Sequence, residues 1–259
     1  MQSRIGVLPE RLQLNSDKTE IIWFCLRANL KTLSSADTTL QIGSTIMEPV
    51  NSVRNLGVYM DSVLSMHTHI GKVSSACFYH LRHLRQLLYA VSKPTMQQLV
   101  SGLLLARIDY YNLVLAGLLA TTLASLKRVV NAAVRLVARL GVHDHVTPAM
   151  QELHWLPVTF RVQYNLCLMV LASVNGRSPE YITDVLVAMS SLQGRATLRS
   201  STSGSFDVNI TRTAFGERAF SVAGHAAWYK LPLNMRLIMH NCKFKRVLKA
   251  RVFSIAYGS

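Results

Sequence analysis

The chain has 259 residues, and its 28 Lys and Arg residues against 13 Asp and Glu residues give a formal net charge of +15. That surplus argues against the class of neutral or acidic globular enzymes that act on small anions. It favours a polyanion as the binding partner, with a membrane surface as the alternative. Half of the residues are hydrophobic and only 16% are charged, so the chain is too apolar for a disordered basic tail and is expected to bury a core.

The positive charge is concentrated in two parts of the chain. Residues 1–65 contain six basic and six acidic residues, whereas residues 66–140 contain nine basic residues and the single acid Asp109. Residues 141–193 have two basic residues against four acids, and residues 194–259 have eleven against two. Because a clustered basic surface is the electrostatic mark of a polyanion-binding protein, the two basic blocks are the first candidates for a binding surface.

The N-terminal part predicts a small α+β region within a mainly α-helical protein. Residues 20–25 are rich in β-branched and aromatic side chains and predict a buried strand. Residues 38–42 and 45–50 flank a Gly-Ser pair, a pattern typical of a hairpin. Residues 53–60 predict a further strand, in which Gly57 lets a backbone or ligand approach closely.

From about Ser65 the hydrophobic period becomes helical, and the first helix is predicted over residues 66–90. His80 and His83 lie beside Arg82 and Arg85 in this helix. Two interpretations of that group remain open, a phosphate-contacting surface and an ordinary solvated helix face. The apolar stripe of the helix consists of Ile70, Val73, Cys77, Leu81, Leu84 and Leu88.

Two more helices complete this block. Ser92-Lys93-Pro94 offers an N-cap and a proline in the first turn, which predicts a helix to about Leu105 or beyond. Residues 123–140 predict another helix, and Gly141 is expected to cap its C-terminus. Its inward face is predicted to be Leu126, Val129, Val130, Ala133, Val137 and Leu140, and its outward stripe Arg128, Asn131, Arg135 and Arg139.

The remaining residues predict a second helical region. Thr147-Pro148 predicts one helix start, and Leu156-Pro157 starts a longer helix that Asn175-Gly176 ends. Residues 190–213 are rich in Ser, Thr, Gly and Arg without periodicity and predict a mobile loop. A final helix is indicated by the apolar face Phe244, Val247, Leu248, Val252 and Ile255, with Lys245, Arg246 and Lys249 largely outside it.

Residues that carry catalytic or metal chemistry are sparse. His143-Asp144-His145 is the best metal candidate by composition, but adjacent residues rarely share a site, so solvated or capping roles are favoured. The nearest carboxylate pair is Asp17 and Glu20, so neither a two-metal catalytic site nor a metal cofactor is expected. The cysteines are far apart and predict reduced, buried thiols of an intracellular protein: Cys25, Cys77, Cys167 and Cys242.

The longest uncharged run covers residues 110–126. Its seventeen residues include polar side chains and fall just short of the roughly 18 apolar residues that a membrane span needs, so a buried helix or helical hairpin is favoured over a span. The N-terminus offers no continuous apolar segment for a secretory signal. We therefore expect a protein of the nucleus or cytoplasm that is not secreted and has no membrane partner.

Several segments together resemble one family. In collinear order they are similar to the end of the reverse transcriptase of jockey-like and chicken-repeat-like non-LTR retrotransposons. The resemblance extends over nearly the whole chain. The matching segments are Leu14–Glu20, Ser52–Asp61 with His69-Ile70, Arg107–Asn112, His154–Val158 and Phe215–Ser221.

The resemblance implies a palm end over residues 1–64, a helical thumb over 65–141 and a C-terminal extension over 142–259 that handles element RNA and target DNA. It implies that Lys18 lies near the phosphate of the incoming nucleotide as an auxiliary lysine, the ordinary alternative being an exposed turn lysine. Leu56-Gly57-Val58 matches the turn that grips the primer end. RNA and DNA contacts are expected from the basic stripes at Lys72, Arg82, Arg85, Arg128, Arg135, Arg139, Lys245 and Lys249.

The departures from the family pattern also matter. The family's catalytic aspartates, which bind Mg²⁺ in the intact enzyme, belong to motifs that precede the Lys18 segment, so the expectation is a truncated, catalytically inactive remnant that retains nucleic-acid binding. Tyr111 stands where relatives commonly have Cys, and residues 228–232 read Trp-Tyr-Lys-Leu-Pro where they tend to have Trp-Asn-x-Leu-Pro. No small-molecule substrate is expected. A non-enzymatic nucleic-acid-binding helical module with a host role remains the alternative.

Overall fold

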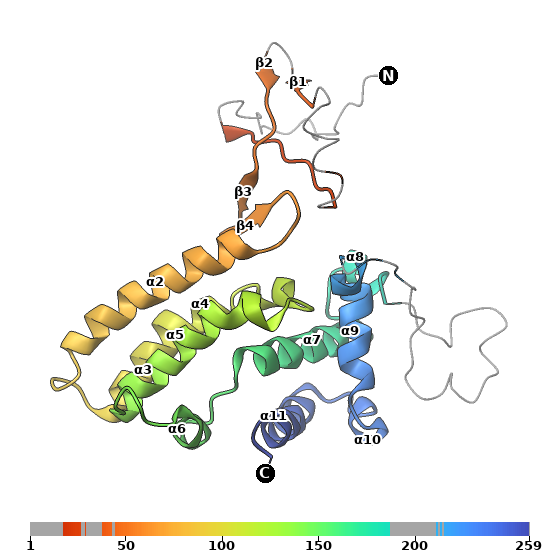
Figure 1. Cartoon of the computed structure of the whole chain (residues 1–259). Helices are drawn as coiled ribbons and strands as arrows, with labels where there is room; N and C mark the ends of the chain where they lie inside the picture. The colour runs from red at the N-terminus through yellow and green to blue at the C-terminus, as the bar shows by residue number, and fades with distance from the viewer. Residues whose placement is uncertain are drawn as a thin grey trace, which may run out of the picture. The chain divides into compact units, whose positions relative to one another are not determined.

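The protein is mainly helical with a small N-terminal β part (Figure 1). The computed structural model describes residues 18–26, 29, 38–42, 45–186, 211, 213 and 215–258. The chain divides into two compact units, Met1–His69 and Ile70–Ser259. The second unit therefore takes in most of the expected thumb and all of the expected C-terminal extension, and we describe the two units separately.

The first unit contains a short hairpin at the predicted place. Strand β1 (Leu40–Ile42) pairs antiparallel with β2 (Thr45–Met47), with Leu40 opposite Met47. The strands are shorter than the pattern indicated, and the connecting Gly43 and Ser44 lie outside the described residues.

The segment predicted as one strand over residues 53–60 is instead a second hairpin. Strand β3 (Ser52–Asn55) pairs antiparallel with β4 (Val58–Asp61). Leu56 and Gly57 form the two-residue turn and both have positive φ angles, 46° and 86°. Two left-handed residues in succession match the right-handed twist of the flanking strands, so Gly57 serves the turn.

The prediction of a buried strand over residues 20–25 is wrong. These residues form only an isolated bridge, between Ile21 and Pro49, and Trp23 and Phe24 are exposed. The Cys25 N–H donates to the Ser62 carbonyl at 2.9 Å, so the segment is anchored by scattered bonds without a regular ladder.

Asp61 ends β4 and organises the turn that follows. Its Oδ1 accepts from the backbone N–H groups of Val63 and Ser65, at 3.2 and 2.8 Å. Its Oδ2 accepts from the Met66 N–H at 3.0 Å and from the Ser65 hydroxyl at 2.9 Å. One carboxylate thus satisfies several donors just before the first long helix, as an N-terminal cap does.

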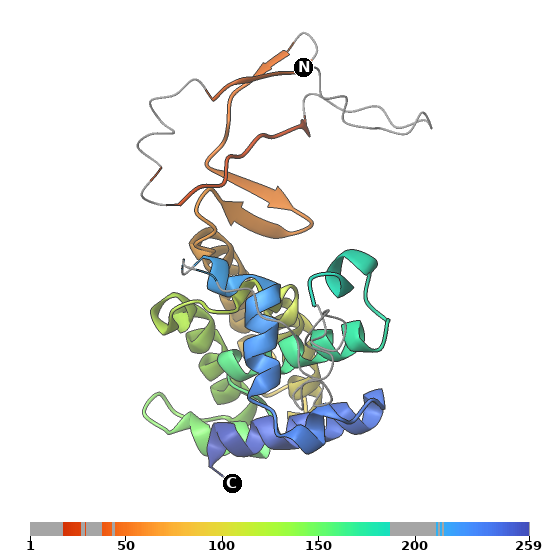
Figure 2. The same ribbon diagram turned by 90° about the vertical axis from the view of Figure 1, so that its right-hand side faces the viewer.

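The second unit is built from helices (Figures 1 and 2). Helix α2 begins at the end of the first unit, and the others follow in chain order. Their bounds are α2 His67–Gln86, α3 Lys93–Val100, α4 Ala106–Asp109, α5 Ala120–Ala138, α6 Val146–Glu152, α7 Val158–Val174, α8 Glu180–Thr183, α9 Phe220–Tyr229, α10 Leu233–Arg236 and α11 Asn241–Tyr257.

The helix predicted from Ser92 is confirmed. The Ser92 hydroxyl accepts from the Thr95 N–H at 3.3 Å, and Pro94 lies in the first turn of α3. A π-helical turn, η3 (Ser101–Leu105), joins α3 to α4, so the run is helical from Lys93 to Asp109.

Helix α5 is confirmed, and its predicted inward face is buried except for Leu140, which lies beyond the helix and is half-buried. The C-terminus of the helix also differs from the prediction. Arg139, and not Gly141, takes the left-handed conformation that ends the helix, with φ 54° and ψ 40°. The Arg139 and Leu140 N–H groups both donate to the Arg135 carbonyl. The Arg139 Nη2 also donates to the Leu88 carbonyl at 3.0 Å, so a long-range bond holds a non-glycine residue in this conformation.

Helix α7 lies at the centre of the C-terminal packing. Helix α9 crosses it, and α11 also packs against it (Figure 2). A Cβ placed on Gly224 would lie 3.2 Å from the Val170 Cγ2, so the glycine permits the close approach of α9 to α7. Trp228 stacks on Phe244, with ring centroids 5.6 Å apart, and joins α9 to α11.

Other expectations for this unit have mixed outcomes. The start of α7 after Pro157 and its end at Asn175 are confirmed. The N-cap of α6 is His145, so Thr147 and Pro148 lie inside its first turn and do not cap it. Most of the loop predicted over 190–213 lies outside the described residues.

The uncharged run over residues 110–126 forms neither a single helix nor a helical hairpin. It comprises a short 3₁₀ helix, η4 (Asn112–Leu115), a turn at Gly117 with φ 69°, and the start of α5. In the part of the chain that the structure describes, no helix has the length and apolar character needed to cross a membrane.

The prediction that all cysteines are buried is wrong for one of them. Cys77 and Cys167 are buried and Cys25 is half-buried, but Cys242 is exposed. Cys242 lies in the first turn of α11, beside Lys243 and before the first buried residue, Phe244. Burial raises the pKa of the Cys77 thiol to about 11 and that of the Cys167 thiol to about 12.

Candidate nucleic-acid interface

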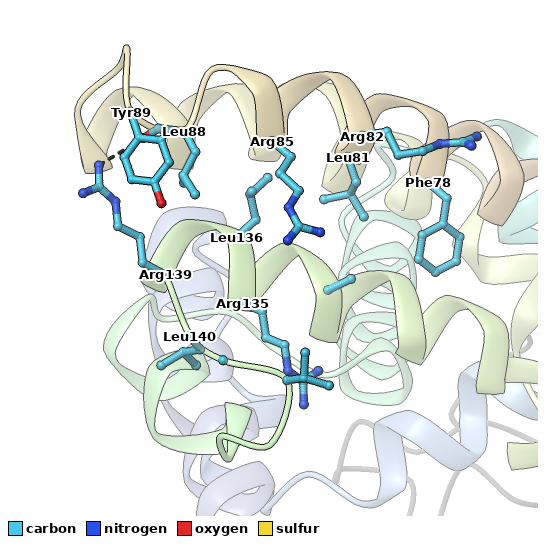
Figure 3. A pocket seen from close by; sticks show the side chains of 13 residues that line it. Phe78, Leu81, Arg82, Arg85, Leu88, Tyr89, Arg135, Leu136, Arg139 and Leu140 are labelled. Carbon is cyan, nitrogen blue, oxygen red and sulfur yellow. Dashed lines mark hydrogen bonds between the residues drawn. The ribbon is translucent and has the colours of Figure 1, made fainter.

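Helices α2 and α5 line a groove with a volume of about 790 Å³ (Figure 3). Four arginines lie in its lining, two from each helix region, and apolar and aromatic side chains make up most of the rest. We call it the α2–α5 groove. Its lining consists of Phe78, Leu81, Arg82, Arg85, Leu88, Tyr89, Ala132, Arg135, Leu136, Arg139, Leu140, Gly141 and Val142.

The α2 side supplies Arg82 and Arg85. Residues 78, 82, 85 and 89 follow one another at steps of four, three and four, so they share one face of the helix and its C-terminal extension. The buried stripe that includes Leu81 and Leu84 packs inward and fixes the orientation of this face. Both arginines are exposed, and Arg85 reaches from α2 toward α5 (Figure 3).

The α5 side supplies Arg135 and Arg139, which are held more firmly. The Arg135 Nη2 donates to the Asp144 carbonyl at 3.4 Å, and its Nε is buried without a hydrogen-bond partner. Besides its bond to Leu88, Arg139 places its guanidinium 5.8 Å from the centroid of the Tyr89 ring. These contacts fix where two of the four positive charges lie, so their positions do not depend on a ligand.

None of the four groove arginines forms an ion pair within the described residues. The two ion pairs there join Lys93 to Glu152 at 2.8 Å and Arg161 to Asp109 at 2.6 Å, and neither involves the groove. The nearest acid along the loop, Asp144, instead accepts from the Gly141 N–H through its Oδ2 at 2.7 Å. Four guanidinium groups around one groove without bound carboxylates produce a positive potential there.

The two aromatic residues of the groove, Phe78 and Tyr89, were not selected by the sequence analysis. Tyr89 lies in the turns after Gln86, where α2 ends, although it keeps the helical spacing of residues 78, 82 and 85, and its side chain is 88% exposed. Phe78 is also exposed, and the two rings lie toward opposite ends of the groove (Figure 3). Only the pattern of aromatic residues interleaved with arginines, at 78, 82, 85 and 89, could have indicated them.

The other predicted contact residues are not brought into this groove. Lys72 and Arg128 lie on α2 and α5 and are exposed, but they do not line it. Lys245 and Lys249 are exposed on α11, and Lys249 lines a separate pocket beside the Asp109–Arg161 pair. The basic surface predicted from the stripes is therefore divided among several places in the second unit.

The residues expected to contact the primer or the nucleotide lie in the first unit. Leu56 is 73% exposed at the tip of the β3–β4 hairpin, next to Gly57, whereas the Val58 side chain is buried. Lys18 is exposed, and the rest of its motif, Leu14–Asp17, lies outside the described residues. Their roles remain predictions.

Two of the segments named in the sequence analysis, 107–112 and 154–158, are held together by hydrogen bonds around Asp109 and Arg161, and we call this group the brace. The Arg161 Nη1 bonds the Asp109 Oδ2 at 2.6 Å, and its Nε donates to the Leu156 carbonyl at 2.9 Å. Asn112 donates to Asp109 at 3.4 Å and accepts from Asn165 at 3.0 Å. These bonds connect Asp109 at the end of α4 and Asn112 in η4 to α7, which carries Arg161 and Asn165.

Two further contacts extend this brace. The Tyr257 hydroxyl donates to the Trp155 carbonyl at 2.5 Å and ties the end of α11 to it. The Arg218 Nη2, from the segment 215–221, donates to the Val114 carbonyl at 3.3 Å, although Arg218 lies more than a hundred residues away along the chain. The three segments therefore act structurally, by tying distant parts of the unit together.

The electrostatics of the brace are set by burial. Burial raises the pKa of the Asp109 carboxyl, while the charge and hydrogen bond of Arg161 and the hydrogen bond of Asn112 lower it by less. Asp109 is half-buried, and its carboxylate accepts hydrogen bonds from the side chains of Arg161 and Asn112. The brace therefore supports the fold, and we assign it no catalytic role.

Among the residues that the structure describes, no three His, Cys, Asp or Glu side chains are grouped so that they could hold a metal ion. In the segment 143–145 all three side chains are exposed, and Asp144 supports the turn after α5. In comparisons with known proteins, no family model, no curated protein and no solved structure matched the chain.

Proposed function

We propose that this chain is derived from the thumb-bearing end of a non-LTR retrotransposon reverse transcriptase, and that its α2–α5 groove binds RNA or DNA. The single observation that carries the binding role is that four arginines line one groove and that none of them is ion-paired within the described residues. Guanidinium groups bond phosphate oxygens in pairs, so this arrangement suits a nucleic-acid backbone.

Two further observations support the proposal. The net charge of +15 favours association with any polyanion, and the second unit holds the basic blocks that account for it. The segments that resemble the reverse transcriptase lie in family order, and three of them form contacts with other parts of one packed unit. The proposal assigns this part of the chain a binding role, and a host-function module with the same groove is the second candidate.

Binding to a labelled RNA oligonucleotide at a series of salt concentrations tests the proposal. Four phosphate contacts predict a slope of log K against log salt of about −2.8 to −3.6, which is a loss of about 50- to 150-fold between 50 and 200 mM salt. Within the part of the chain that the structure describes, neither Arg82 nor Arg85 is held by an ion pair, and both are exposed, so the double variant Arg82→Ala, Arg85→Ala should fold normally and reduce the slope by about 1.4 to 1.8.

The double variant Arg177→Ala, Lys230→Ala is the matched control, because it also removes two positive charges and both residues are exposed on the second unit and do not line the groove. It should leave both affinity and slope nearly unchanged. Equal effects of the control and the groove variant would mean that charge over the whole surface, and not the groove, binds the nucleic acid. Salt-independent binding, or none at 50 mM salt, would contradict the proposal as a whole.

A further inference from the structure

The α2–α5 groove combines its charges with a surface that phosphate binding alone does not need. Leu81, Leu88, Leu136 and Leu140 line it between the arginines, and Val142 at its rim is 82% exposed. A duplex presents its sugar-phosphate backbone to a groove of this kind and keeps its bases stacked inside, where they cannot contact such a lining.

The aromatic residues indicate which kind of ligand fits the α2–α5 groove. Tyr89 has the Arg139 guanidinium near its ring at 5.8 Å from the centroid, yet 88% of the side chain is exposed. The ring therefore keeps a large accessible surface on which a planar group can stack. Phe78 is exposed toward the other end of the groove (Figure 3). Exposed rings that alternate with arginines are the arrangement by which proteins hold unpaired bases and their phosphates.

The dimensions agree with a short strand. From Phe78 to the end of α2 at Gln86 there are eight residue steps, which at a helical rise of 1.5 Å per residue is roughly 12 Å, and Tyr89 lies in the turns that follow. At a spacing of about 3.4 Å per nucleotide, that length accommodates on the order of three to four stacked nucleotides. Arg85 reaches toward α5 between the two rings, where the phosphates of such a strand would pass, and Arg82 extends along α2 at the Phe78 end (Figure 3).

We infer that the α2–α5 groove is a binding site for single-stranded nucleic acid, with a base stacked on Tyr89 and the backbone held by Arg82, Arg85, Arg135 and Arg139. The inference rests on the proposed function and narrows its substrate class from nucleic acid in general to an unpaired strand. Tyr89 then contributes affinity without charge, which separates its role from that of the arginines.

The test compares a fluorescein-labelled 12-nucleotide RNA with the duplex of the same sequence by anisotropy, using the full chain at fixed salt. We expect the single strand to bind at least about tenfold more tightly than the duplex. Tyr89→Ala should weaken single-strand binding by about 5- to 100-fold, which is the stacking contribution of one base. Tyr89→Phe should restore most of the affinity, because the ring and not the hydroxyl carries the contact.

Tyr181→Ala is the matched control, because Tyr181 is 71% exposed on α8 and lies outside the groove. Both tyrosines are exposed, so circular dichroism should show both alanine variants folded, and Tyr181→Ala should bind as the wild type does. Equal binding of single strand and duplex, or an unchanged affinity of Tyr89→Ala, overturns the single-strand inference, while the arginine variants still decide the proposed function.

Two other outcomes have separate meanings. If neither form of RNA binds, the proposed function fails together with this inference. An acidic amphipathic peptide could also fit a groove with leucines below arginines, so a poly-glutamate–leucine peptide serves as a competitor. If it binds the groove more tightly than the RNA does, the occupant is a protein segment and the inference is overturned.

Discussion

Replacing Arg161 by methionine tests the brace that holds the helical unit together. The substitution keeps most of the aliphatic volume but removes the 2.6 Å ion pair to Asp109 and the 2.9 Å bond to the Leu156 carbonyl. The side chains of Arg161 and Asp109 are 13% and 36% exposed, so the pair is partly screened. Removing one partner of a fully buried pair costs about 3–5 kcal/mol, and discounting for the exposure of Asp109 leaves about 2–3 kcal/mol.

A thermal melt followed by circular dichroism measures this cost. For a unit of this size, 1 kcal/mol corresponds to about 2–4 °C, so Arg161→Met should lower Tm by about 4–12 °C. The matched control is Lys93→Met, which removes the other ion pair, with side chains 48% and 67% exposed. That pair is screened by solvent, and its loss should leave Tm nearly unchanged.

The pH dependence has a definite sign. Burial raises the pKa of Asp109 above its ordinary value of about 4, so the folded state favours the neutral carboxyl. The stability that this provides is present below pH 4 and is lost as pH rises through the raised pKa. Arg161→Met removes the charge that lowers the pKa of Asp109, so in this variant the loss of stability with rising pH should extend to higher pH. Adding Asp109→Asn to Arg161→Met should recover part of the lost Tm.

The reasoning about the brace is refuted if Arg161→Met lowers Tm no more than Lys93→Met does. It is also refuted if the double variant Asp109→Asn, Arg161→Met is less stable than Arg161→Met alone, because an uncompensated buried charge would then not be the cause.

Three further predictions concern stability and accessibility. Asn112→Ala should cost about 1–3 kcal/mol, because Asn112 is 2% exposed and its loss leaves Asn165 without its acceptor; an unchanged denaturation midpoint would contradict this. A thiol reagent at pH 8 should label Cys242 at once but Cys77 and Cys167 only on unfolding, because burial raises the pKa of the latter two to about 11 and 12; equal labelling rates would be the contrary result. Amide hydrogen exchange should be faster in the β1–β2 and β3–β4 hairpins than in α5 and α7, because each described strand has one ladder partner; uniform protection would show that the two-stranded sheets are as stable as the helices.

Helix starts were predictable where local chemistry determines them. Ser92 and Pro94 mark the start of α3, and Asn175 follows the end of α7, because caps and prolines act within one turn. The hairpin over residues 52–61 was predicted as one strand because Asn55-Leu56-Gly57 is not the usual two-residue turn sequence. The positive φ of Leu56, 46°, could not be predicted from the sequence, because the pairing of β3 with β4 selects that conformation.

Helix α9 was not predicted because its sequence is apolar on nearly all sides. Gly224 and buried His225 interrupt any amphipathic stripe, and the helix depends on packing against α7 and on the Trp228–Phe244 contact. Such a segment does not show the helical period that marks α2 and α5. Its position follows from the tertiary structure.

The candidate site was predictable as separate stripes but not as a groove. The arginines at 82, 85, 135 and 139 follow from the helical period, whereas their place around one groove depends on where the fold puts α2 relative to α5. Arg139 was expected within the helix and lies instead in its left-handed C-cap, where it can reach the Leu88 carbonyl. Tyr89 keeps the helical spacing of Phe78, Arg82 and Arg85, so periodicity could place it on their face of α2 but could not show that this face lines a groove.

The central claim is that nucleic acid lies in the α2–α5 groove, and photo-crosslinking measures that position directly. A short RNA carrying 4-thiouridine is bound to the full chain, irradiated, and the adducts are mapped by mass spectrometry. The account predicts adducts within residues 78–89 and 135–142, which line the groove. Adducts confined to the basic face of α11, or equally frequent in the Arg82→Ala, Arg85→Ala variant, would contradict it.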